Sequence, residues 1–166
     1  MIQKCSYMGV LEVFFEEPTK IHFIREISKR ISLAPTSVRK HIQTLLKEGM
    51  IIKKKGAPFD GFVAYRSSDS FLFYKRAYNL ASLLKLKLFL QEHMGPREVR
   101  IFGSYPRGED IEESDIDIIL LSKHRKKAEY QNIEERLSRK LHVQIISSYD
   151  ELEEPLRSNV FKGWVL

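Results

Sequence analysis

Residues 101–121 read IFGSYPRGEDIEESDIDIILL and decide the fold of the second half of the chain. The stretch begins in an apolar strand expected over Glu98–Phe102 and breaks at Gly103-Ser104. It returns to a strand expected over Asp115–Leu121. A Gly-Ser turn between strand and helix offers backbone N–H groups and a hydroxyl, which suit a phosphate. The sequence therefore predicts a strand–turn–strand unit with a phosphate site at its turn.

Two carboxylates, Asp115 and Asp117, lie two residues apart in the second strand. Side chains alternate along a strand, so both are expected on one face. Like charges placed side by side repel, and folding alone gives no reason for the pair. Mg²⁺ prefers oxygen ligands and typically lies between one or two carboxylates and a phosphate. We therefore expect both residues to be metal ligands.

The spacing of these residues resembles the DNA polymerase beta-like nucleotidyltransferases, and within them the minimal nucleotidyltransferase branch. The resemblance rests on Gly103-Ser104, Arg107-Gly108, a five-residue spacer and Ser114-Asp115-Ile116-Asp117. It departs at Pro106, where the family usually has Ala, and a proline is tolerated in the first turn of a helix.

The resemblance implies Mg²⁺, or Mn²⁺ in its place, and ATP as substrate or ligand. It implies catalytic and metal-binding roles for Asp115 and Asp117. The nucleotide-binding residues that it implies are Gly103, Ser104, Arg107, Gly108 and Ser114. For Arg107, a surface ion pair with nearby acids is an equal alternative. For the basic run Lys123–Lys127, a solvated loop is favoured over contact with nucleic acid or an acidic partner.

The family places a third carboxylate on a later strand, and here Gln144 occupies the matching context, Val143–Ile146. Glutamine can offer a carbonyl oxygen but cannot act as a base. His142 is expected on the same face and is an alternative base. Asp150 is near in sequence but is expected beyond the end of the strand.

Composition limits the class of protein. The chain has 166 residues, of which 43% are hydrophobic and 30% charged, so a buried core is expected rather than disorder. Its single cysteine, Cys5, cannot form an intramolecular disulfide, which favours a cytoplasmic location. No apolar run has membrane-spanning length, and the start of the chain lacks the pattern of a signal peptide.

The net charge of +6 is unevenly distributed. Residues 1–70 carry 12 Lys or Arg against 7 Asp or Glu, whereas residues 71–166 carry 16 against 15. A basic module ahead of a nearly neutral one suggests that the first part meets a polyanion. A basic solvated surface is the alternative.

The first part is expected to form three helices and a hairpin. The helices are expected over Met8–Glu16, Ile24–Ile31 and from Pro35 to Gly49, and the strands over Met50–Lys55 and Phe62–Arg66. The segment resembles a winged helix-turn-helix, which implies that the third helix enters the major groove of DNA and that the wing touches the backbone. The expected DNA contacts are Thr36, Ser37, Arg39, Lys40, Gln43, Lys53, Lys54 and Lys55. A winged helix used only for protein contacts or dimerisation is the alternative.

A long helix is expected over Ser70–Met94 and is apolar nearly all round. That pattern favours burial on more than one side, against the front domain, the sheet or a second subunit in a homodimer. Its aromatic cluster, Phe71, Phe73, Tyr74 and Tyr78, is interpreted as core.

The remaining elements complete an α+β architecture. A helix is expected over Ala128–Leu141, a strand over His142–Ser147 and a last helix over Asp150–Ser158. The sequence predicts a winged helix over residues 1–69 and a small mixed-sheet nucleotidyltransferase-fold domain over residues 70–166, with the long helix packing on or linking the two.

Two functions follow. One is transfer of AMP from ATP to an acceptor, and the resemblance implies a partner toxin as that acceptor. The other is a DNA-binding regulator or antitoxin that binds nucleotide or partner without turnover. The intact first motif favours the enzyme, and Gln144 favours the regulator.

Overall fold

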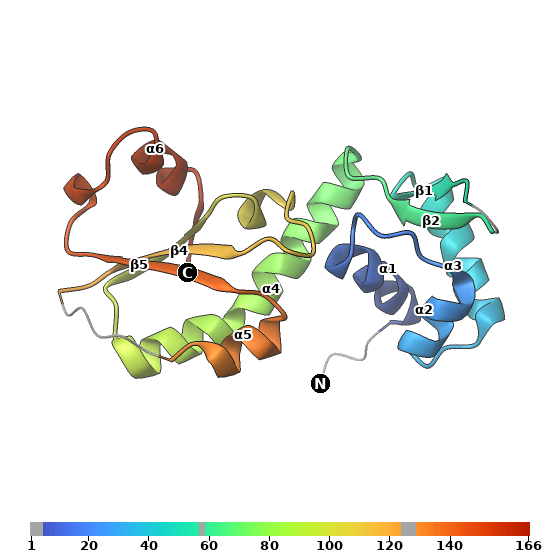
Figure 1. The fold of residues 1–166 in the computed structure, drawn as a ribbon, viewed down its shortest axis with the longest axis horizontal. Helices are drawn as coiled ribbons and strands as arrows, with labels where there is room; N and C mark the ends of the chain where they lie inside the picture. The colour runs from blue at the N-terminus through green and yellow to red at the C-terminus, as the bar shows by residue number, and fades with distance from the viewer. Residues whose placement is uncertain (1–4, 57–58, 124–128) are drawn as a thin grey trace. The chain divides into compact units, whose positions relative to one another are not determined.

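The computed structural model describes residues 5–56, 59–123 and 129–166 (Figure 1). The chain forms two compact units that divide between Tyr78 and Asn79, inside its longest helix. Each unit has its own buried apolar core. Among the described residues, none of the helices is both long and apolar enough to cross a membrane.

Unit 1 contains three helices, a hairpin and the first part of the long helix. In order these are α1 (Ser6–Glu16), α2 (Ile24–Arg30), α3 (Pro35–Lys47), β1 (Ile51–Lys54), β2 (Gly61–Ala64) and α4 (Asp69–Met94). Apolar residues at helical spacing give α1 and α3 one buried side each, and Phe71 of α4 joins the same core. The helices and the hairpin expected from the sequence are all present. The loop residues Ala57 and Pro58 lie outside the described residues.

A buried histidine joins the hairpin to the helices of unit 1. The backbone of His22 pairs with Phe62 of β2 through two hydrogen bonds of 2.7 and 2.9 Å. Its ring lies edge-on to Phe14 of α1, with ring centroids 5.1 Å apart. His22, between α1 and α2, is therefore a third, very short pairing partner of the hairpin.

Unit 2 is built on a four-stranded mixed sheet with the strand order β5-β4-β3-β6. Its elements after α4 are β3 (Glu98–Phe102), η1 (Tyr105–Arg107), β4 (Ile116–Leu121), α5 (Gln131–Leu137), β5 (Leu141–Ile146), η2 (Tyr149–Glu151), α6 (Leu156–Phe161) and β6 (Trp164–Val165). Strands β4 and β5 are parallel, whereas β3 is antiparallel to both of its neighbours. The mixed sheet expected from the sequence is confirmed.

The two faces of this sheet have different coverings. Helix α5 and the C-terminal part of α4 cover one face, where alternate residues of β3 and β4 form the larger core (Figure 1). Helix α6 covers the other face through a smaller cluster that includes Phe102, Ile119 and Val160. Residues of β4 therefore alternate between the two cores, and Asp117 belongs to the face that α6 partly covers.

The structure corrects several expectations about element bounds. The helix expected over Asp150–Ser158 is instead the short turn η2 followed by α6, because Pro155 interrupts it. Trp164 and Val165, for which no element was expected, form β6 at the edge of the sheet. Helix α5 is shorter than expected, since it ends at Ser138 in the left-handed conformation (φ 52°).

Helix α4 contributes to the core of each unit, through Phe71 in unit 1 and Leu83, Leu86 and Leu90 in unit 2, but the expectation that its whole aromatic cluster is core is wrong. Phe71 is buried, but Phe73 is 68% exposed and Tyr74 is 40% exposed, so these two aromatic residues are not core. Three leucines at one-turn spacing, Leu80, Leu84 and Leu88, are also exposed. The apolar composition of the helix therefore does not reflect burial on every side.

The edge strand gives a test of the fold, because Gly163 fits only without a side chain. A Cβ atom at this position would lie 2.1 Å from the carbonyl oxygen of Ile101. We expect Gly163→Ala to destabilise unit 2 by about 2 kcal/mol, as overpacking against backbone does. The measurement is urea unfolding followed by the fluorescence of Trp164, the single tryptophan of the chain.

Gly9→Ala is the matched control, since its Cβ would make an ordinary contact of 3.9 Å with Ile31. Alanine in a helix is more favourable than glycine by about 0.5–1 kcal/mol, so this variant should not lower the urea concentration at which the Trp164 fluorescence reports unfolding. An unchanged transition in Gly163→Ala would contradict the close pairing of β6 with β3.

Candidate functional site

Gly103 and Asp117 meet where β3 ends and β4 begins. Phe102 is the cross-strand partner of Asp117, so Gly103 is the first residue beyond the paired strand. Gly103 has a φ of +80°, and a Cβ built on it would lie 2.5 Å from Oδ2 of Asp117. Only glycine combines this conformation with this close approach. The turn backbone therefore passes directly against the carboxylate.

Asp115 directly precedes β4, and its side chain is exposed. Ile116, between the two carboxylates, is fully buried in the larger core. That anchor, with the alternation of side chains along the strand, places Asp115 and Asp117 on the opposite side of the sheet. Within the described part of the chain, no hydrogen bond or ion pair engages the Asp115 carboxylate. Its oxygens are therefore available to a ligand.

The neighbour of Asp117 on β5 is His142. The parallel register pairs Asp117 with His142 and pairs Ile119 with Gln144. Nδ1 of His142 lies 3.0 Å from Oδ1 of Asp117, within hydrogen-bonding distance. Gln144, assigned from the sequence to the third carboxylate position, lies two residues further along the strand. His142, the sequence-based alternative, is thus the residue that the structure brings to the second carboxylate.

Asp150 lies beyond the end of β5, as expected. It is part of η2, and its carboxylate pairs with Arg157 at 3.3 Å. It therefore belongs to a local surface pair and does not join the carboxylates of β4.

The Gly-Ser turn continues into a single turn of 3₁₀ helix rather than an α-helix. Pro106 lies in its first turn, where a proline costs no hydrogen bond. The carbonyl oxygen of Ser104 accepts hydrogen bonds from the N–H groups of Arg107 and Glu109, both at 3.1 Å. Gly108 ends the turn with a φ of +71°. The turn is thus closed by its own backbone.

Arg107 forms an ion pair with Glu109, with Nε and Oε2 2.6 Å apart. Both side chains are about half exposed, at 49% and 50%. This is the surface ion pair that the sequence offered as the alternative to nucleotide binding.

The loop between the turn and β4 is held from inside by a polar cluster that the sequence did not reveal. The side chain of Asp110 is fully buried and accepts a hydrogen bond of 2.8 Å from Asn79. Arg139 approaches Asp110 at 3.5 Å and donates to the carbonyl oxygen of Glu112. A carboxylate without solvent is stable only when it is paired in this way. In the sequence, Asp110 is one of five acids between the turn and β4, and nothing marks it as the buried one.

Three further contacts rigidify the same segment. Asn79 also donates to the carbonyl oxygen of Tyr105, at 2.8 Å. Burial raises the pKa of Tyr105 to about 12, so its phenol stays protonated and shares a 2.8 Å hydrogen bond with Ser82. The hydroxyl of Ser114 accepts a hydrogen bond from the N–H of Ile111, at 2.9 Å. Ser114 therefore stabilises the loop directly before Asp115.

Two cavities lie beside these residues. One, of about 490 Å³, is open beside Ser114 and Asp115 and is otherwise lined by Glu112, Glu113, Gln131, Glu134, Glu135, Ser138, Arg139 and Lys140. The other, of about 50 Å³, lies at the Gly-Ser turn. The first cavity thus reaches Asp115, and the second reaches Gly103, which lies against Asp117.

The residues expected to contact DNA lie in unit 1. On α3, Thr36, Arg39, Lys40 and Gln43 are exposed, and Ser37 is half-buried. On and after β1, Lys53, Lys54 and Lys55 are exposed, and Lys53 forms an ion pair of 3.1 Å with Asp60. Of the basic run Lys123–Lys127, Lys123 is exposed and the rest lies outside the described residues.

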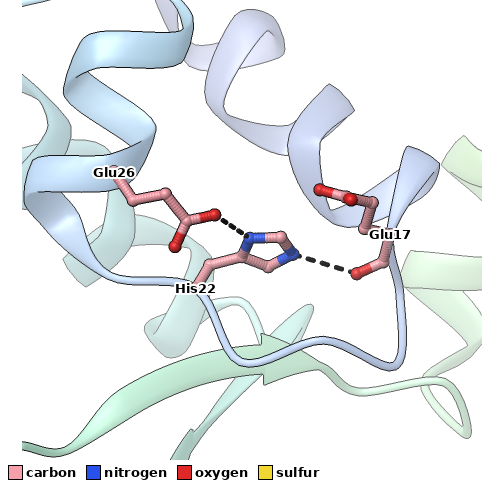
Figure 2. A group of neighbouring side chains, drawn as sticks. All are labelled: Glu17, His22 and Glu26. Atoms are coloured by element: carbon pink, nitrogen blue, oxygen red, sulfur yellow. Dashed lines mark hydrogen bonds and ion pairs between the residues drawn. The ribbon is translucent and has the colours of Figure 1, made fainter.

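One group of three side chains in unit 1 has the spacing of a metal site, but its polar atoms are already hydrogen-bonded to other protein atoms. Potential ligand atoms of Glu17, His22 and Glu26 all lie within 4.8 Å of one another. Figure 2 shows both ring nitrogens of His22 in use, by the carboxylate of Glu26 at 3.2 Å and the carbonyl oxygen of Glu17 at 2.9 Å.

The carboxylate of Glu17 is also committed elsewhere. Burial favours a higher pKa for Glu17, but hydrogen bonds from Lys20 and Arg30 outweigh it and hold the pKa below its usual value. Both ring nitrogens and this carboxylate already form hydrogen bonds within the protein. We therefore interpret the three residues as a structural cluster that links α1, α2 and the hairpin.

The comparisons with known proteins agree with the geometry of unit 2. A family model described as "Polymerase beta, Nucleotidyltransferase" matches residues 84–166, which is half of the chain. Comparison with curated proteins gave no match, and neither did comparison with solved structures. The matched residues include the Gly-Ser turn, both carboxylates and His142. The chain belongs to the polymerase beta nucleotidyltransferase family.

Proposed function

We propose that the chain binds ATP together with Mg²⁺, or Mn²⁺, at Asp115 and Asp117, and transfers AMP to a hydroxyl group of an acceptor. The observation that carries the proposal is the contact of the Gly103 backbone with the Asp117 carboxylate, beside the unengaged Asp115. This contact brings a turn suited to phosphate against Asp117, and Asp117 and Asp115 together are suited to a hard cation.

The residues present fit a divalent cation. The donor set is two carboxylates from adjacent positions on one side of the sheet, and Asp115 has an exposed side chain. A Cβ at residue 103 would fill the space next to Asp117, and glycine leaves that space open. When bound, the ion would be held by Asp115 and Asp117 and would neutralise charge on the α-phosphate.

His142 is the residue we assign as general base. Donation of a hydrogen from Nδ1 to Asp117 would leave the lone pair of Nε2 free to accept a proton. The side chain of His142 is 69% exposed, so an acceptor can reach it. In the transfer, the acceptor oxygen bonds to the α-phosphorus, the bond to the β-phosphate oxygen breaks, and pyrophosphate leaves. The hydroxyl proton passes to Nε2 of His142.

The transfer test uses ATP labelled at the α-phosphate with Mg²⁺ and a cell extract as the source of acceptor. We expect wild type to give a labelled acceptor, Asp117→Asn to lose both ATP binding and transfer, and His142→Gln to keep binding but lose at least about 100-fold in transfer rate. Asp150→Asn is the matched control, since its carboxylate pairs with Arg157, and it should act as wild type.

Different results separate the two candidate functions. Wild type that binds ATP without forming a labelled product would overturn transfer and favour a regulator that only binds nucleotide. Product appearing only after Gln144→Asp would show that Gln144, rather than His142, occupies the base position. A labelled protein as the product would favour the partner toxin that the sequence resemblance implies.

A second candidate function, which is compatible with the first, is DNA binding by unit 1. We propose that its three helices and hairpin act as a winged helix, with α3 in the major groove and β1 at the phosphate backbone. The support is the exposed polar side of α3, opposite the buried Val38, Ile42 and Leu45, together with three consecutive exposed lysines. Such a module would let the chain act in transcription regulation, as an antitoxin can at its own operon.

Binding to a 30-base-pair duplex tests this proposal. We expect the double variant Arg39→Ala, Lys40→Ala to bind at least about tenfold more weakly. The slope of log affinity against log salt should fall by about 2, since two phosphate contacts are lost. Arg136→Ala, which removes an exposed charge from α5, is the control and should bind as wild type. Equal binding by the double variant and wild type would contradict the role of α3.

A further inference from the structure

The small cavity beside the Gly-Ser turn is lined partly by residues outside the motif, which come from the end of the chain. It is lined from the turn and from the end of α6 by Gly103, Pro106, Arg107, Asn159, Lys162 and Gly163. None of these six residues is acidic. Two are cations and one is an amide, so the lining offers hydrogen-bond donors and fits an anion.

The edge strand fixes the position of Lys162. Strand β6 pairs Trp164 with Ile101 and Val165 with Arg100 in antiparallel register. Lys162, the helical C-cap residue of α6, lies two residues before this strand and lines the same cavity as Gly103. Glycine at position 163 lets the chain pass close to β3, because any Cβ there would overlap the carbonyl oxygen of Ile101. The lysine therefore belongs to the edge of the site by the topology of the sheet.

The helix that carries Asn159 is also firmly held. Val160 is fully buried on the sheet face that carries Asp117, in a cluster with Phe102 and Ile119. On the same face, the guanidinium of Arg100 lies 5.4 Å from the ring centre of Tyr149 and 4.8 Å from that of Phe161. Cation–π contacts of this kind stabilise the end of α6 against the sheet.

The cationic head of Lys162 is not used inside the fold. In the described ranges, neither the Lys162 ammonium nor the Asn159 amide has a hydrogen-bond or ion-pair partner. Lysine has three donors and no acceptor, and it commonly binds phosphate as a point charge. Gly103 lines this cavity and also contacts Asp117, so an anion here lies one residue from the candidate metal ligands.

We propose that Lys162 and Asn159 bind the β- and γ-phosphates of the nucleoside triphosphate. The inference rests on the proposed function for the location of the α-phosphate, but the anion site itself can be tested without a nucleotide. It assigns the end of α6, together with Arg107, to the recognition of a triphosphate over a monophosphate.

The test measures dissociation constants for ATP, AMP and inorganic tripolyphosphate, each with Mg²⁺, by calorimetry. We expect Lys162→Ala to weaken ATP and tripolyphosphate binding at least about tenfold, the loss of a hydrogen bond between charged groups. AMP lacks the two outer phosphates, so its affinity should not change. Lys162→Arg keeps the charge and should restore most of the affinity. Lys85→Ala, an exposed lysine of α4, is the control and should bind as wild type.

The outcomes separate this inference from the proposed function. ATP binding that is the same in wild type and Lys162→Ala would overturn the role of Lys162 and leave nucleotide binding in place. Tripolyphosphate binding that depends on Lys162, without ATP binding, would support the anion site and overturn the proposed function. Binding of neither ligand by wild type would overturn both.

Discussion

The contact between the backbone of Gly103 and the carboxylate of Asp117 is the constraint on which the rest of the site depends. It exists because β3 and β4 pair in a register that brings Phe102 opposite Asp117. A residue with a side chain at 103 would need a strained φ and would displace the carboxylate. The pairing of two adjacent strands thus sets the distance between the Gly-Ser turn and the Asp117 carboxylate.

Each face of the sheet contributes one support to this contact. On one side, Asn79, Asp110 and Arg139 hold the loop that ends at Asp115, through hydrogen bonds that bury a carboxylate. On the other, α6 and β6 bring Lys162 to the turn and close the edge of β3. Both supports come from segments distant in sequence from the Gly-Ser turn, and so the site depends on the whole of unit 2 being folded.

The local elements were predictable from the sequence because their signals are local. Hydrophobic periodicity and the positions of Gly and Pro predict the three helices of unit 1, the hairpin, the long helix and the strands around the Gly-Ser turn.

Strand β6 was missed because two residues are too few to show a periodic pattern. Likewise, an exposed Phe73 cannot be distinguished from a buried Phe71 by composition, since burial depends on which side of α4 finds a partner. The polar cluster of Asp110 was missed because its partners lie 31 and 29 positions away. The residue opposite Asp117 on β5 could not be predicted, because it depends on the register between β4 and β5. Alternating apolar residues fix which face of a strand is buried, but they still allow the register to shift by two residues.

The proposed function requires that Asp115 and Asp117 together hold a divalent cation at the Gly-Ser turn. Its most direct test is a crystal structure of the chain with Mn²⁺ and a non-hydrolysable ATP analogue, with the ion located by anomalous scattering. We predict an anomalous peak bonded to carboxylate oxygens of both Asp115 and Asp117 and to a phosphate oxygen of the analogue. A structure with the analogue bound and Mn²⁺ elsewhere, or with the phosphates away from Gly103, would contradict the account.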